Sequence, residues 1–235
     1  MQLKALTQRV YYTENDSTTD RPCLGYVKGD KFSLMLDAGN SAVHVECFYD
    51  AVKQKGFPLP AFCGVTHFHW DHTFGMMATG IPCIACMHTQ QKLEEMEQWG
   101  WEESDMQKRL QTGEETPFCD TCIRLEYPDR TKIKVKTADM VFENRLSLYL
   151  GGVWAEFFRV ISPHTNDSVV ILADDVLFLG DSYCSVPVGD DWVYDKSLLR
   201  LYIQVLKNIE FTHCIKGHHP PQTKAALLAE LEAEL

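Results

Sequence analysis

Four side chains that can bind a metal ion lie within six positions of this chain, in the segment His67-Phe68-His69-Trp70-Asp71-His72. An apolar run, Phe62 to Thr66, comes directly before it and predicts a β-strand, so the cluster follows a strand. Burying such polar groups without partners costs about 2 kcal/mol or more for each group. A shared metal ion removes that cost, because imidazole and carboxylate both bind zinc, iron or manganese.

The spacing within the cluster indicates two ligand positions. If the strand continues past Thr66, His67 and His69 leave the same face and can bind one cation. Asp71 and His72 follow where the chain must turn, and they can reach a second position nearby. A lone histidine is usually a surface or hydrogen-bonded residue, but the density of this cluster favours metal ligands.

Composition limits what such a site can act on. A chain of 235 residues can bury one large core, and we expect a single domain over residues 1–235. The 22 basic and 33 acidic residues give a net charge of −11, which disfavours nucleic acid as a partner. The chain has no signal-like start and no run of about 18 apolar residues, so we expect a cytoplasmic protein without a membrane segment.

Nine cysteines are spread through the chain, and this odd number at low density favours reduced thiols over a disulfide framework. The pairs Cys83/Cys86 and Cys119/Cys122 have a spacing found in zinc sites. However, 32 residues (87 to 118) separate the pairs, and residues three apart on a strand face opposite sides. Whether these thiols do more than pack stays open.

Hydrophobic periodicity predicts many short strands with helices between sets of them, which is typical of a layered sheet-and-helix domain. The predicted strands are 4–12, 23–28, 32–36, 62–66, 81–87, 132–136, 146–150, 153–161, 168–172, 176–179 and 211–215. Helices are expected after Ser41 to about Gly56, over 196–208 with Asp195 as N-cap, and over 223–235. A polar stretch at about 89–113, with Trp99 and Trp101, predicts a helical excursion that either covers the site as a lid or packs at the surface.

The cluster matches the H-x-H-x-D-H signature of the metallo-β-lactamase-fold hydrolase superfamily. Four further segments resemble that family's motifs in the family's order, namely Leu36–Gly39, Ser162–Ser168, Leu177–Ser182 and Lys216–His218. The resemblance runs over nearly the whole chain. It implies an α/β (α+β) fold, a four-layer αββα sandwich of two mixed β-sheets flanked by helices, with a metal site at one edge of the sheets.

The resemblance also implies two divalent metal ions, with zinc as the first choice and iron or manganese as alternatives. It assigns His67, His69 and His164 to the first metal, Asp71, His72 and His218 to the second, and Asp181 to a bridge between them. The chain departs from the family pattern at three places. Pro163 precedes His164 where the family usually has glycine, Asn166-Asp167 replaces a pair of small residues, and His219 follows His218 where glycine is common.

Such a site predicts a binuclear hydrolase in which a metal-bridging hydroxide cleaves a small ester, thioester or lactone, since coordination lowers the pKa of water towards about 7. Asp71 is the expected catalytic residue, which orients this water and takes its proton. Asp37 is expected either to orient a ligand histidine or to form a turn. The alternatives are an iron persulfide dioxygenase of the same fold, using His67, His164 and Asp181, and a non-catalytic metal-binding protein.

The resemblance narrows the substrate by elimination. Asp181 stands where common secreted zinc β-lactamases carry a cysteine ligand, which disfavours antibiotic hydrolysis. Only 17 residues (235 minus 218) follow His218, too few for the added helical domain of glyoxalase II, and the acidic balance disfavours a nuclease. We expect a small-molecule substrate and no nucleic-acid or membrane partner, and we leave open the substrate, the native metal and whether the protein is a homodimer.

Overall fold

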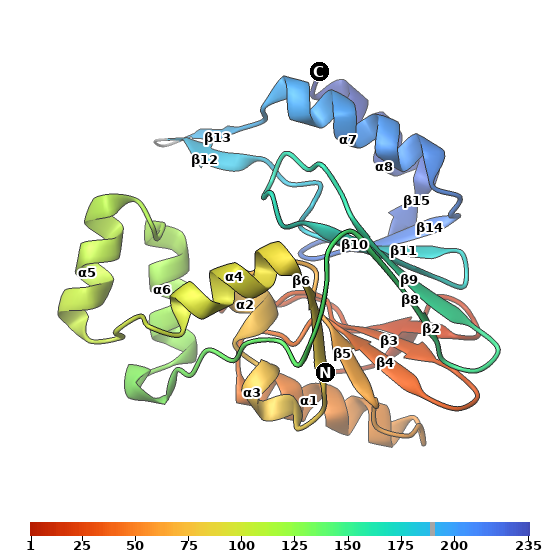
Figure 1. Cartoon of the computed structure of the whole chain (residues 1–235), viewed down its shortest axis with the longest axis horizontal. Coiled ribbons are helices and arrows are strands. Elements are labelled where there is room, and N and C mark those ends of the chain that lie inside the picture. The colour runs from red at the N-terminus through yellow and green to blue at the C-terminus, as the bar shows by residue number, and fades with distance from the viewer. Residues whose placement is uncertain (189–190) are drawn as a thin grey trace.

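Two mixed β-sheets stack face to face, and helices cover the outer face of each sheet (Figure 1). The structure is a computed structural model that describes residues 1–188 and 191–235. Helices α1 and α3 lie on one side of the stacked sheets and helices α7 and α8 on the other. The four-layer αββα arrangement predicted from the sequence is therefore confirmed.

The first sheet has the strand order β1 to β7, antiparallel from β1 to β4 and parallel from β4 to β7. Its strands are β1 (Lys4–Ala5), β2 (Val10–Tyr12), β3 (Gly25–Lys28), β4 (Ser33–Leu36), β5 (Phe62–Gly64), β6 (Cys83–Cys86) and β7 (Met140–Phe142). Strands β3 and β4, which lie in the predicted strands 23–28 and 32–36, form a hairpin whose turn is Gly29 to Phe32.

The second sheet has the order β15-β14-β11-β10-β9-β8, in which only β11 and β14 are parallel. Its strands are β8 (Arg145–Tyr149), β9 (Trp154–Arg159), β10 (Val169–Ala173), β11 (Val176–Gly180), β14 (His213–Lys216) and β15 (Gln222–Thr223). A separate hairpin, β12 (Val186–Val188) with β13 (Asp191–Val193), extends from this half of the molecule. The sequence did not predict this hairpin.

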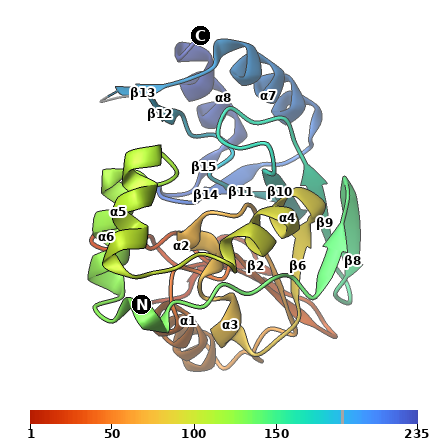
Figure 2. The same cartoon turned by 60° about the vertical axis from the view of Figure 1, so that its left-hand side comes forward.

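Helices connect these strands and close the outer layers (Figure 2). They are α1 (Ala42–Gln54), α2 (Trp70–Thr73), α3 (Met76–Thr79), α4 (Met87–Met96), α5 (Glu103–Thr112), α6 (Pro117–Glu126), α7 (Lys196–Asn208) and α8 (Lys224–Ala233), with a 3₁₀ turn at Arg130–Lys132. Both predicted N-caps are observed, since Ser41 accepts a hydrogen bond from the His44 backbone and Asp195 from Ser197 and Leu198. In the described part of the chain, no helix has the length and apolar character needed to cross a lipid bilayer.

Alternating side chains on the strands separate three hydrophobic layers. In β4, Leu34 and Leu36 point between the sheets, whereas Met35 packs under α1. In β11, Phe178 points between the sheets, and Leu177 and Leu179 pack under α7 and α8. Because β4 and β11 are buried on both faces, side-chain alternation in these strands holds the sheets together and attaches the helices at the same time.

Two strand predictions were wrong. Residues 4–12 form two short strands, because the chain turns back through Leu6 and Thr7, whose backbone N–H groups both donate to Val10. Residues 132–136 form a 3₁₀ turn and an irregular segment. Ile133 and Val135 are buried as the alternation suggested, but β7 occupies the position beside β6 where this segment would have paired. The helical excursion also extends beyond residue 113, to the end of α6.

The distance between the sheets depends on a glycine. A Cβ atom at Gly64 in β5 would lie 2.5 Å from the Phe157 ring of the opposite sheet. We expect Gly64→Ala to destabilise the protein by about 1–3 kcal/mol through overpacking, measured by denaturant unfolding. Phe157→Leu should relieve the clash, so the double variant should lose less than the sum of the single losses. If the loss of stability in the double variant equalled the sum of the two single losses, a clash between residue 64 and the Phe157 ring would not be the cause.

His44 is buried in the first turn of α1 and accepts a hydrogen bond from the Asn40 backbone at 3.4 Å. Burial, with a smaller contribution from Arg21, lowers the pKa of His44 from 6.5 to about 3. The unfolded chain therefore binds this proton first on acidification, so the stabilising effect of neutral His44 is complete above pH 6.5 and is lost as the pH falls towards 3.

We expect His44→Gln to reduce the loss of stability between pH 7 and pH 5 by up to about 2 kcal/mol. Urea unfolding of both proteins at the two pH values, in the presence of a chelator, measures this difference. Taking the difference between pH values removes any pH-independent effect of the substitution. Equal losses in the two proteins would show that His44 does not titrate in this way.

Candidate metal centre

The candidate ligands lie at the edge of the sandwich where paired parallel strands end. Strands β4 and β5 are parallel, as are β11 and β14, so their carboxyl ends meet at one edge of each sheet. Asp37 follows β4, and the segment from Thr66 follows β5. Asp181 follows β11 and His218 follows β14 on the second sheet. The sandwich therefore brings together side chains that are far apart in the sequence.

The structure places all seven predicted ligands in two groups. One group is His67, His69 and His164, and the other is Asp71, His72, Asp181 and His218. Within each group, one ligating atom of every residue lies within 4.8 Å of those of the others. No further group of three or more histidine, cysteine, aspartate or glutamate side chains with this geometry occurs among residues 1–188 and 191–235.

The strand geometry predicted for His67 and His69 was wrong. Strand β5 ends at Gly64, and both histidines lie in the turn that leads into α2. Asp71 and His72 lie within α2 itself, which is only one turn long. The two histidines of the first group thus converge through a turn, with ring centroids 4.6 Å apart, and not through the alternation of a strand.

Asp37 orients one histidine from each group. Its Oδ2 accepts a hydrogen bond from His72 Nδ1 at 2.7 Å, which leaves His72 Nε2 to face the centre. The same carboxylate accepts hydrogen bonds from the backbone N–H and the hydroxyl of Thr66. The Thr66 hydroxyl is then free to accept from His67 Nδ1 at 3.1 Å, so His67 also presents Nε2 to the centre. Of the two roles considered for Asp37, these contacts support ligand orientation.

Asp167, which stands where the family pattern has a small residue, forms hydrogen bonds within the site. Its carboxylate is buried and accepts hydrogen bonds from the Phe68 backbone at 2.9 Å and from Thr89 at 2.8 Å. Asp167 therefore joins the loop that carries His164 to the turn that carries His67 and His69. His164 Nε2 lies 3.1 Å from His69 Nδ1, so the two nitrogen atoms point at a common space.

Two glycines of the motif segments permit close backbone contact at the second group. A Cβ atom at Gly217 would lie 1.9 Å from Asp181 Oδ1, so any larger residue would displace that carboxylate. Gly180 has a φ of +52°, and a Cβ atom there would lie 2.2 Å from Thr66 Oγ1. The Gly-His and Gly-Asp pairs therefore each combine a ligand with the glycine that makes room for the site.

The unpaired atoms at the centre fit a bound cation. His67 Nε2 and His72 Nε2 are buried, and neither has a hydrogen-bond partner among the described residues. His72 Nε2 lies 3.0 Å from Asp71 Oδ2 and 3.5 Å from Asp181 Oδ2, but outside hydrogen-bonding directions. Buried nitrogen atoms without partners are costly, and divalent metals accept this combination of imidazole and carboxylate ligands.

The two groups differ in charge. Burial lowers the pKa of His67 and His164 and lowers that of His69 to about 3, so the first group offers neutral imidazoles. In the second group burial also acts against charge, but Asp71, Asp37 and Asp181 outweigh it and raise the pKa of His72. Protons therefore compete with a cation for the second group more than for the first.

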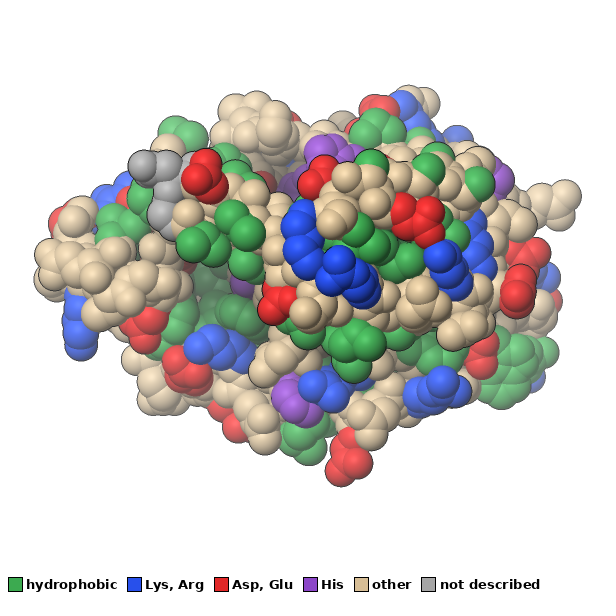
Figure 3. Space-filling model, turned by 90° about the horizontal axis from the view of Figure 1, so that it is seen from above, with side chains coloured by type: hydrophobic (Ala, Val, Ile, Leu, Met, Phe, Trp, Pro, Cys, Tyr) green, Lys and Arg blue, Asp and Glu red, His purple; other side chains and the backbone are tan. Residues whose placement is uncertain are grey.

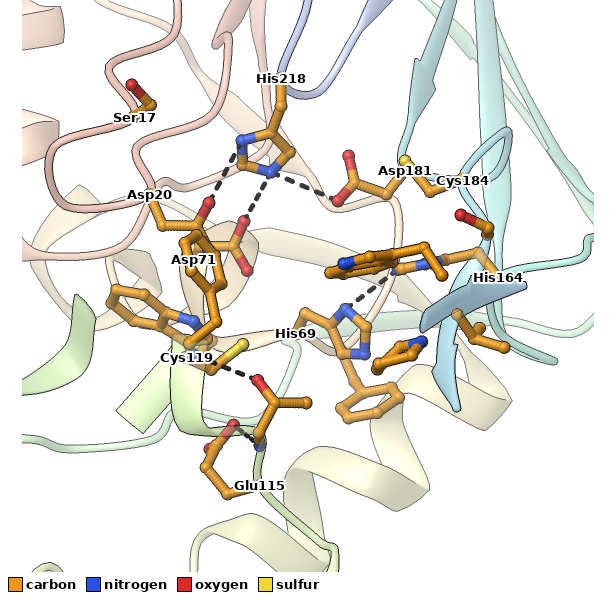
Figure 4. A pocket seen from close by; sticks show the side chains of 18 of the residues that line it. Ser17, Asp20, His69, Asp71, Glu115, Cys119, His164, Asp181, Cys184 and His218 are labelled. Carbon is orange, nitrogen blue, oxygen red and sulfur yellow. Dashed lines mark hydrogen bonds and ion pairs between the residues drawn. The ribbon is translucent and has the colours of Figure 1, made fainter. Parts of the chain in front are cut away.

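The structure also adds Asp20, which the sequence did not indicate. Asp20 Oδ1 lies 3.5 Å from His218 Nδ1, whereas Asp71 Oδ2 approaches Nε2 of the same ring (Figure 4). Its backbone has a φ of 55°, which aspartate tolerates better than most residues. No motif links Asp20 to the site, because the contact depends on how the segment before β3 folds over β14. Between the two neighbouring histidines, His218 and not His219 joins the ligand group.

The paired cysteines do not form a metal group. Cys83 and Cys86 lie in β6, whereas Cys119 and Cys122 lie in α6, and all four are free thiols. Within the described residues, no cysteine belongs to a candidate metal group.

Five of the seven candidate ligands form the floor of a pocket of about 670 Å³, namely His69, Asp71, His164, Asp181 and His218. Figure 3 shows a hollow on this face of the molecule, edged by hydrophobic side chains. The walls come from α4 to α6 and their connections, from the segment around Asp20, and from residues 183–187 with Trp192 and Tyr194. The helical excursion and the β12–β13 hairpin thus lie on either side of the floor.

We expect Asp37→Asn to weaken zinc affinity by about 10–100-fold, because the amide cannot orient His72 and Thr66 as the carboxylate does. Asparagine tolerates the positive φ of 58° at this position, so backbone strain is not a confounding effect. Competition with a chromophoric chelator measures the affinity. Asp50→Asn, on the exposed face of α1, is the matched control and should bind zinc like the wild type. Unchanged affinity in a folded Asp37→Asn protein would contradict the orienting role.

Comparison with solved structures shows the fold. The DIM-1 metallo-beta-lactamase is 17% identical with a TM-score of 0.67, over 99% of this chain and 95% of that chain. A metallo-beta-lactamase from Pontibacter korlensis is 19% identical with a TM-score of 0.65, over 98% of each chain. A double mutant of a sec-alkyl sulfatase is 15% identical with a TM-score of 0.69, over 99% of this chain and 41% of that chain.

A search of curated protein sequences finds no match. The sequence model of the metallo-beta-lactamase superfamily, in contrast, matches residues 24–211. That range includes the Asp37 network and six of the seven candidate ligands, all except His218. The chain belongs to the metallo-beta-lactamase superfamily.

Proposed function

We propose that this protein is a binuclear metal-dependent hydrolase that cleaves a small ester, thioester or lactone, with zinc as its metal. One observation carries the proposal. Members of two adjoining groups of metal-ligating side chains form the floor of a pocket of about 670 Å³ whose walls are largely apolar. A site of this size and composition suits a small organic molecule. Membership of a superfamily that consists mostly of metal-dependent hydrolases supports the same reading.

His67, His69 and His164 would hold one cation, and Asp71, His72 and His218 the other, with Asp181 between them. When bound, two divalent cations supply Lewis-acid activation of a water molecule and of a substrate carbonyl. The chain contributes the orientation of these ligands through Asp37 and Asp167, together with a wall that limits water around the substrate.

Asp71 is the residue we propose for proton transfer. Burial alone would raise the pKa of Asp71, but His72 and His218 outweigh it and hold the pKa of this carboxyl below its usual range. Its Oδ2 lies 3.0 Å from His72 Nε2 and 3.1 Å from His218 Nε2. This leaves Oδ1 to accept a proton from water at the pocket floor.

The thiols in the pocket do not offer a competing nucleophile. Cys119 and Cys184 both line the pocket, on opposite sides of the floor (Figure 4). Burial raises the pKa of both thiols well above neutral pH. Because the thiolate and not the thiol is the reactive form, neither cysteine is activated for attack. These observations favour water as the nucleophile.

We expect Asp71→Asn to lower kcat by about 10²–10⁴-fold on lactone or thioester substrates, since asparagine cannot accept the proton. The bound metal must be quantified in the same samples, because Asp71 is also a candidate ligand. An Asp71→Asn protein that keeps its metal but loses turnover would isolate the proton-transfer role. Asp50→Asn again provides a control in which only an exposed carboxylate changes.

Metal analysis of protein purified without chelators tests the proposal as a whole. About two zinc ions per chain, with hydrolysis that a chelator abolishes, are expected for a binuclear site. Equal turnover by wild type and Asp71→Asn would exclude the proposed mechanism. One iron per chain, with oxygen uptake on a persulfide, would replace the hydrolase with an iron dioxygenase that uses His67, His164 and Asp181.

A further inference from the structure

We propose that the pocket selects uncharged carbonyl substrates with a bulky aromatic or alkyl group and excludes substrates that carry an anionic group away from the reacting bond. This inference rests on the proposed hydrolase function and specifies its substrate class. It follows from the apolar walls of the pocket and from the sign of the charges around them.

The apolar wall comes from three segments that are distant in the sequence. Aromatic residues that line the pocket include Phe68 from the turn before α2, residues from the α4–α6 segment, and residues near the β12–β13 hairpin. The last two sets include Trp99, Trp101 and Phe118, and Trp192 and Tyr194, respectively. Wall residues from both sides of the floor can therefore contact one bulky substituent while its carbonyl reaches the ligand groups.

The tryptophan wall is held in place by a covered cation. The Arg109 guanidinium carbon lies 4.8 Å from the centroid of the Trp99 ring and 4.5 Å from that of Trp101. Arg109 also donates a hydrogen bond to the Gly100 carbonyl at 2.8 Å, and only 5% of the residue is exposed. The two indoles thus enclose this positive charge, so Arg109 stabilises the wall but does not line the pocket.

The charged side chains that line the pocket, apart from the ligand groups, are acidic. They are Asp20, Glu114, Glu115 and Glu230, and no lysine or arginine lines the pocket within the described part of the chain. Figure 4 shows Asp20 beside His218 and Glu115 beside Cys119, so carboxylates lie near the floor and along the α4–α6 side. Of the four, Glu230 is paired with Lys216 at 2.8 Å.

Lys216 is not available to an anion. It is buried, with its ammonium 4.5 Å from the centroid of the Tyr183 ring and bonded to Glu230. His219 also lines the pocket, with its ring centroid 6.0 Å from that of Tyr183. An anionic substituent would therefore lose water against a largely apolar wall that no lysine or arginine lines within the described residues, which is unfavourable. The net charge of −11 adds a long-range repulsion of the same sign.

The test uses three ketone analogues that share a 4-phenylbutan-2-one frame and cannot be hydrolysed. They differ only in the para substituent, which is a carboxamide, a carboxylate or an aminomethyl group. Binding to the metal-loaded protein is measured by calorimetry and by quenching of tryptophan fluorescence. We expect the carboxamide to bind about tenfold more tightly than the carboxylate, and the aminomethyl analogue to bind at least as well as the carboxamide.

A charge substitution at the rim of the pocket tests whether charge at the wall causes the preference for the carboxamide over the carboxylate. Phe118 lies on α6, lines the pocket and is 51% exposed, so Phe118→Lys places a cation at the wall without disturbing the core. We expect this variant to narrow the preference for carboxamide over carboxylate by about threefold. Leu125→Lys is the matched control, on the same helix and 57% exposed but away from the pocket, and should leave the preference unchanged.

The outcomes separate this inference from the proposed function. Tighter or equal binding of the carboxylate, or binding of none of the analogues, would overturn the inference. An equal effect of Phe118→Lys and Leu125→Lys would overturn it as well. Charge discrimination without hydrolysis of any ester, thioester or lactone would refute the proposed function and leave the discrimination standing. Hydrolysis without discrimination would refute only the substrate class.

Discussion

The hydrogen bonds of Asp37 are the interaction on which the candidate centre depends most. This buried carboxylate orients His72 directly and His67 through Thr66, so a single side chain aligns one histidine in each ligand group. Asp37 reaches both because β4 and β5 are paired and parallel, with Leu36 opposite Gly64 in the register. A shift in that pairing would move the carboxylate away from both rings. The geometry of the site is therefore a consequence of strand pairing.

The stacking of the two sheets completes the centre. Asp181 and His218 come from the second sheet, and they meet Asp71 and His72 only because the sheets pack over a shared apolar layer. Small residues permit this approach, with Gly64 against Phe157 between the sheets and Gly217 against Asp181 at the edge. Asp167 then joins the His164 loop to the backbone of Phe68. Packing and polar contacts thus act on the same two loops.

A second consequence of the fold is the contrast between the floor and the walls of the pocket. The floor is made by segments that directly follow sheet strands, and their polar groups are oriented by buried partners. The walls are made mainly by the α4–α6 segment and the region of the β12–β13 hairpin, which are not part of the two stacked sheets. In a family whose members share a fold, such peripheral segments are where specificity is expected to vary.

Many of the helices and strands could be predicted from local sequence patterns. Ser41 and Asp195 cap helices as their residue types indicate, and the alternation of Leu146 and Leu148 does mark a strand. The alternation at 132–136 failed because burial of every second residue does not require a partner strand. The contact of Asp20 with His218 had no local signal, since it joins residues 198 positions apart (218 minus 20).

The sequence by itself determined the kinds of ligand and the family, because the spacing of His67, His69, Asp71 and His72 and the order of the motifs are properties of the chain. Only the tertiary structure decided which buried partners orient those ligands and which charges surround them. The physical reason is that strand pairing and sheet stacking set distances between residues that are remote in sequence. The acidic lining and the covered Arg109 likewise arise from packing, which no local pattern encodes.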